Sequence, residues 1–132
     1  MAYPSNGPGR PRVTIIGVVD DDESVRDALS SLIRSAGYRC ELFPSAEAFL
    51  ESNRMGQTDC MLLDVQMPGL SGIELQARLR KMNCPVPVIF VTAHADESLR
   101  ARALRAGATA FLEKPFNDDV LLGAIGSALN HH

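Results

Sequence analysis

The pattern that most constrains the fold is a fivefold alternation of short apolar runs with longer amphipathic segments. The runs occupy residues 13–19, 38–43, 60–63, 88–91 and 109–112. Most of them are continuously apolar, which is typical of parallel strands that are covered on both faces. The pattern therefore predicts an α/β fold with one parallel sheet between two layers of helices.

Local signals indicate where the intervening helices begin and end. Ser45 and Asn117 can each accept hydrogen bonds from the first turn of a helix, and Ser71 with Glu74 has the spacing of a capping box. Gly37 is a typical helix stop. We expect helices over about residues 25–36, 45–50, 71–82, 96–106 and 117–129.

Length and composition exclude several classes of protein. The 132 residues suffice for one domain with a sizeable core. A net charge of -3 gives no electrostatic footprint for nucleic acid, and the absence of a long apolar run argues against a membrane span. Three cysteines without metal-site spacing predict reduced thiols in a cytoplasmic protein. We expect a disordered N-terminal tail over 1–12 and a folded domain over 13–130.

Chemistry-bearing side chains follow four of the five apolar runs. Asp20 and Asp21 come after the first, Asp64 after the third, Thr92 after the fourth and Lys114 after the fifth. Because the carboxyl ends of parallel strands meet at one edge of a sheet, we expect these side chains to lie together. This gathering is the strongest functional signal in the sequence.

The residue types point to phosphoryl transfer. Neighbouring carboxylates repel unless a cation neutralises them, and hard oxygen ligands suit Mg²⁺, with Mn²⁺ as a further possibility. Asp64 could then accept a phosphoryl group as an aspartyl phosphate. Lys114 and the Thr92 hydroxyl could bind phosphoryl oxygens.

The chain resembles the receiver domain of two-component response regulators from about Val13 to Leu129. The resemblance is carried by the Val-Asp-Asp block at 19–21, the Asp64-x-x-Met-Pro turn, Thr92-Ala93 and Lys114-Pro115-Phe116. It implies a flavodoxin-like (βα)5 fold, doubly wound, with strand order 2-1-3-4-5. It also implies a cis peptide bond before Pro115.

The resemblance assigns roles residue by residue. Asp20, Asp21 and Asp64 match the metal-binding acids, and Asp64 is also the phosphoacceptor. Thr92 and Lys114 match the family's hydroxyl and lysine. The remaining assignments are a main-chain carbonyl to the metal from Gln66, a switch aromatic at Phe111, and a tuning role beside the phosphoryl site for Gln66 and His94.

The implied function is a phosphoacceptor that assists its own phosphorylation, not an enzyme with external substrates. Its expected partners are a sensor histidine kinase, in a phosphorelay, and a second copy bound after phosphorylation through the face formed by residues 96–129. The motifs at 45–50 and 113–116 resemble the FixJ-type branch, whose receivers usually precede a LuxR-type helix-turn-helix. We therefore expect transcription as the output, with DNA bound only through an output domain that this chain lacks.

Two other readings remain open on the sequence. Asp20-x-Asp22 resembles the nucleophile motif of haloacid-dehalogenase-type phosphatases, a class of Mg²⁺-dependent hydrolases. Such enzymes need further acids late in the chain and usually a cap domain, for which there is no room. A degenerate receiver that acts as a binding module would not require the acids, Thr92 and Lys114.

Overall fold

The computed structural model describes residues 13–94 and 96–130, and the tail expected over 1–12 lies outside them. The strands are β1 (Ile15–Val19), β2 (Arg39–Phe43), β3 (Cys60–Asp64), β4 (Val88–Thr92) and β5 (Ala110–Glu113). The helices are α1 (Glu23–Ser35), α2 (Ala46–Glu51), α3 (Gly72–Lys81), α4 (Glu97–Arg105) and α5 (Asp118–Leu129), with a 3-10 turn, η2 (Met55–Gln57). The η2 turn is the only element among the described residues that the sequence pattern did not predict.

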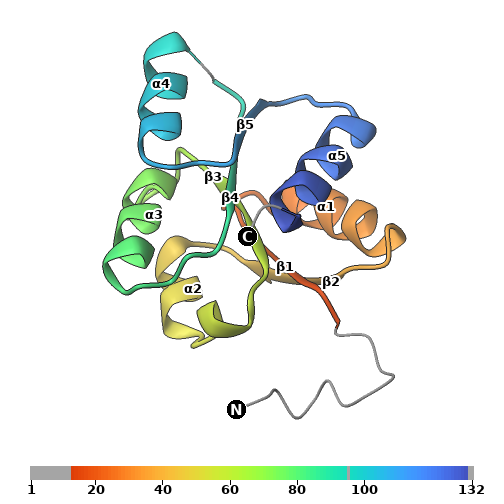
Figure 1. Cartoon of the computed structure of the whole chain (residues 1–132). Coiled ribbons are helices and arrows are strands. Elements are labelled where there is room, and N and C mark those ends of the chain that lie inside the picture. Colours follow the sequence, from red (N-terminus) through yellow and green to blue (C-terminus); the bar gives the residue numbers. More distant parts are fainter. Residues whose placement is uncertain (1–12, 95, 131–132) are drawn as a thin grey trace.

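The five strands form one sheet in the order β2-β1-β3-β4-β5, and every neighbouring pair is parallel. This confirms the expected topology. Helices α1 and α5 cover one face, and α2, α3 and α4 cover the other (Figure 1). After β1 the chain adds β2 on one side of β1 and then crosses to add β3 on its other side. The carboxyl ends of β1 and β3 therefore flank a crevice, because the connections that follow them lead in opposite directions.

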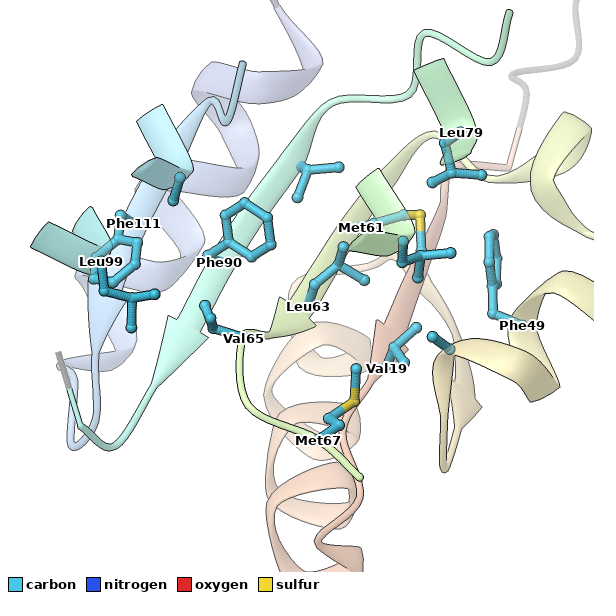
Figure 2. Packing of buried hydrophobic residues seen from close by; sticks show 14 residues of the cluster. Val19, Phe49, Met61, Leu63, Val65, Met67, Leu79, Phe90, Leu99 and Phe111 are labelled. Atoms are coloured by element: carbon cyan, nitrogen blue, oxygen red, sulfur yellow. The ribbon is translucent and has the colours of Figure 1, made fainter. Parts of the chain in front are cut away.

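Each face of the sheet has its own hydrophobic core. Leu63 and Phe90 point toward α2, α3 and α4, where they pack with Phe49, Leu79 and other buried side chains (Figure 2). Ile16 and Leu62 point to the opposite face and pack against Ile33 of α1 and Ile125 of α5. The central strands β1, β3 and β4 are apolar on both faces for this reason, and their packing positions the residues at their carboxyl ends.

The predicted helix ends are confirmed by hydrogen bonds. Ser45 accepts from Ala48 N, Asn117 from Asp119 N, and Ser71 forms the full capping box with Glu74. Gly37 has a φ of 93°, as a left-handed helix stop requires. Small differences occur at strand ends, where hydrogen bonding decides the boundary: the first strand begins at Ile15, and Asp64 and Thr92 are the last residues of β3 and β4.

Candidate functional site

Three carboxylates meet at the carboxyl ends of β1 and β3. One oxygen from each of Asp20, Asp21 and Asp64 lies within 4.8 Å of the others. Asp20 and Asp64 are buried, and Asp21 is exposed at the mouth of the cluster. The structure therefore brings together the three acids that the sequence placed at the strand ends.

Backbone groups orient the two buried acids. The Asp22 N–H donates to Asp20 Oδ1 at 2.9 Å, and the Gln66 N–H donates to Asp64 Oδ1 at 3.1 Å. The guanidinium of Arg26, on α1, donates to the main-chain oxygen of Asp20 at 2.7 Å. These contacts hold both carboxylates toward the crevice and leave their second oxygens, Oδ2, for other partners.

Lys114 enters the cluster from the loop after β5. Its Nζ lies 2.9 Å from Asp20 Oδ2 and 3.8 Å from Asp64 Oδ2. The lysine is mostly buried, and the peptide bond that follows it is cis, as the family resemblance implies. One cation therefore faces both buried acids.

The ionisation of Asp64 reflects this environment. The pKa of Asp64 is raised to about 6, mainly by burial and also by the Asp20 carboxylate, although Lys114 and the Gln66 N–H act in the opposite direction. A carboxylate with a pKa near neutrality is poorly solvated in its charged form. A bound cation stabilises the negative charge of such a group, and covalent modification removes it.

Thr92 and Phe111 lie on the neighbouring strands. Thr92 is 1% exposed, its hydroxyl oxygen accepts from the His94 N–H at 3.3 Å, and its main-chain oxygen accepts from the Lys114 N–H at 2.8 Å. Phe111 is buried beside Leu99 of α4 (Figure 2). Phe111, the expected switch aromatic, is thus packed inward in this structure.

Two residues that support the site were missed by sequence reasoning. A Cβ on Gly72, at the start of α3, would overlap the main-chain oxygen of Asp64 and lie 3.2 Å from the Phe90 ring. Arg26 binds Asp20 across six residues. Neither had a sequence signal, because a glycine after a cap and an arginine on an amphipathic helix both have ordinary explanations.

The donor set fits a hard divalent cation. Every ligand atom that the cluster offers is a carboxylate oxygen, with no thiol or imidazole in the group. Oxygen ligands of this kind suit Mg²⁺ or Mn²⁺ and not Zn²⁺. The Gln66 N–H binds Asp64, and a metal-binding role for the Gln66 carbonyl stays a prediction.

Comparison with known families identifies the domain. Residues 16–126 match the response regulator receiver domain. The chain belongs to this family. Receiver domains are signalling domains of two-component systems that bind Mg²⁺ through acidic residues and interact with histidine kinases. The phosphatase hypothesis finds no support among the matches.

The similar proteins include transcriptional regulators. The chain is 42% identical to the response regulator protein TodT of Pseudomonas putida over 89% of its own length and 52% of TodT. It is 45% identical to the transcriptional regulatory protein FixJ of Bradyrhizobium diazoefficiens over 86% of its length and 56% of FixJ. The crystal structure of FixJ-N superposes with a TM-score of 0.83 at 34% identity, covering 92% of this chain and 98% of that one.

The receiver spans about half the length of these curated relatives. Within the described residues, none of its helices has the length and apolarity that a bilayer crossing demands.

Proposed function

We propose that Asp64 accepts a phosphoryl group from a phosphohistidine of a sensor kinase. A carboxylate oxygen of Asp64 attacks phosphorus, the bond between phosphorus and the imidazole nitrogen breaks, and that nitrogen keeps the electron pair. The observation that carries the proposal is the position of Asp64 at the end of β3, facing one lysine and two further acids. We place this exchange in the cytoplasm, in agreement with three free cysteines.

Asp20, Asp21 and Asp64 would hold Mg²⁺ or Mn²⁺, with the Gln66 main-chain carbonyl as a further ligand. The ion supplies charge neutralisation for the phosphoryl oxygens when it is bound. The chain's own contribution is the fixed direction of the two buried carboxylates, which the Asp22 and Gln66 N–H groups hold. That preorganisation assists phosphorylation without making the domain an enzyme for external substrates.

Lys114 and Thr92 would bind the transferred group. The lysine ammonium, now 2.9 Å from Asp20, would turn to a phosphoryl oxygen, and the Thr92 hydroxyl would donate to another. Phe111 would respond to the movement of Thr92. Gln66 and His94, which are exposed beside the site, would tune the lifetime of the phosphorylated state.

The proposed output is self-association through α4, β5 and α5, leading to control of transcription. The similarity to FixJ and TodT over their receiver portions supports assignment to the FixJ-type branch. Phosphorylation adds charge and strong acceptors at one edge of the sheet, next to these elements. DNA would be bound by an output domain and not by this one, whose net charge is -3.

The decisive experiment is phosphorylation with acetyl phosphate and Mg²⁺, followed by mass spectrometric mapping of a hydroxylamine-labile adduct. We expect one adduct, on Asp64, that requires the metal and is absent from Asp64→Asn. An adduct on Asp20 with steady turnover of phosphate esters would support a phosphatase instead. A protein that forms no adduct with acetyl phosphate and turns over no phosphate ester would be a binding module.

A further inference from the structure

The loop between β3 and α3, residues 65–71, connects the phosphoacceptor to a helix and is tied down at several points. The Gly72 N–H donates to the Val65 main-chain oxygen at 3.1 Å. Val65 and Met67 bury their side chains in the core, Val65 near Phe90 and Met67 beside Val19 (Figure 2). The Gln66 N–H binds Asp64. Residues 65–67 of the loop are therefore held by contacts with neighbouring residues and with the core.

The second half of the loop, at Gly69 and Leu70, is held by a residue that is distant in the sequence. Oε2 of Glu47, on α2, accepts the Leu70 N–H at 2.9 Å, across 23 residues. Gly69 has a φ of 79°, and a Cβ on it would lie 2.8 Å from that same carboxylate oxygen. The carboxylate thus lies directly against the turn. The Leu70 N–H, together with the residue's own N–H, keeps the pKa of Glu47 below its usual value.

The position of α2 on the sheet is set by other residues. The helix is anchored by Ala46 and Phe49, both fully buried, and Ser45 caps its start. Glu47 itself is exposed. Its side chain also interacts with its own N–H and with the charge of Arg78, but its hydrogen bond to another segment is the one to the loop. That loop carries the main-chain carbonyl of Gln66 that we assign to the metal.

We propose that Glu47 is a positioning residue for phosphorylation, which acts by fixing residues 66–70 so that the Gln66 carbonyl and the Asp64 carboxylate face the same cation. This inference rests on the proposed metal-dependent phosphorylation of Asp64. A charge-assisted hydrogen bond to a backbone N–H is one of the stronger ties that an exposed side chain can make. Groups that orient metal ligands from outside commonly control affinity.

The test compares three variants. Glu47→Ala removes the acceptor, Glu47→Gln keeps an acceptor but removes the charge, and Glu51→Gln removes the same charge one turn further along α2 as the matched control. Three quantities are measured: exchange of the Leu70 amide hydrogen in the metal-free protein, the Mg²⁺ dissociation constant, and the rate of phosphorylation by acetyl phosphate.

We expect Glu47→Ala to accelerate Leu70 exchange and to weaken Mg²⁺ binding by a factor on the order of ten. Glu47→Gln should lie between Glu47→Ala and the wild type, because a weaker, neutral acceptor remains, and Glu51→Gln should match the wild type. Equal losses in Glu47→Gln and Glu51→Gln would show that only net charge matters and would overturn the positioning role. So would faster Leu70 exchange with unchanged Mg²⁺ affinity. A wild type that fails to become phosphorylated would count against the proposed function, whereas the exchange measurement reports on Glu47 alone.

Discussion

Lys114 is ion-paired with Asp20, with 2.9 Å between Nζ and Oδ2, and this distance is shorter than the 3.8 Å that separates the same nitrogen from Asp64 Oδ2. The lysine therefore neutralises a proposed metal ligand before any metal is bound. A divalent cation held by Asp20 would compete with Lys114 for this carboxylate. The lysine would then be available to a phosphoryl group.

Lys114→Ala should strengthen Mg²⁺ binding, because the competing cation is removed. We expect a decrease in the dissociation constant of roughly tenfold, the usual size of the effect of one close charge on an ionic equilibrium. Titration calorimetry measures it, with the exposed Lys81→Ala as control. The variant should nevertheless lose the conformational response to beryllofluoride. Unchanged Mg²⁺ affinity in Lys114→Ala would show that the ion pair does not compete with the metal.

Asp64→Asn should stabilise the metal-free protein, and the gain should depend on pH. The folded-state pKa of Asp64, about 6, lies above the ordinary value of 3.8. The folded protein thus binds the proton more tightly, and the stability that this confers is complete below pH 3.8 and lost as pH rises through 6. Between pH 3.8 and 6 the free energy of unfolding of Asp64→Asn should therefore rise relative to that of the wild type by up to about 3 kcal/mol.

Urea unfolding of both proteins in EDTA, from pH 4.5 to 7.5, measures this advantage. Addition of Mg²⁺ at pH 7 should stabilise the wild type more than the variant. A stability difference that does not change with pH would show that Asp64 titrates normally.

Thr92→Ala should accept phosphate on Asp64 and yet fail to self-associate. The Thr92 hydroxyl is proposed to transmit phosphorylation of Asp64 to Phe111. A nearly complete switch between two conformations requires that phosphorylation favour one of them by a free energy on the order of 5 kcal/mol. Sedimentation of wild type and variant with beryllofluoride and Mg²⁺ measures the outcome. Normal association of Thr92→Ala, or a strictly monomeric activated wild type, would contradict the proposed output.

Gly72→Ala should destabilise the domain, because its Cβ would overlap the Asp64 main-chain oxygen. We expect a loss of roughly 1–3 kcal/mol in the free energy of unfolding. Gly123→Ala in α5 is the matched control, because a Cβ there meets nothing within 4 Å. That change should stabilise the helix by about 0.5–1 kcal/mol. The explanation fails if both variants shift the urea midpoint in the same direction.

The sequence by itself determined the elements and the set of reactive residues. Continuous apolar runs such as 60–63 predict buried strands, and caps such as Ser71 with Glu74 predict helix starts, because both signals act within a few residues. Placing Asp20, Asp64, Thr92 and Lys114 at one edge needed only the rule that parallel strands share a direction. The strand order itself came from the family resemblance and not from the residue pattern.

The tertiary structure decided how those residues pair. That Lys114 binds Asp20 across 94 residues, that Glu47 holds Leu70 across 23, and that α3 approaches Asp64 closely enough to require Gly72 are all consequences of packing. Local periodicity fixes which face a side chain lies on, but not its distance from a group on another element. Those distances are set by the packing of α2 and α3 on the sheet and by the register of the strands, and they appear only once the whole domain is folded.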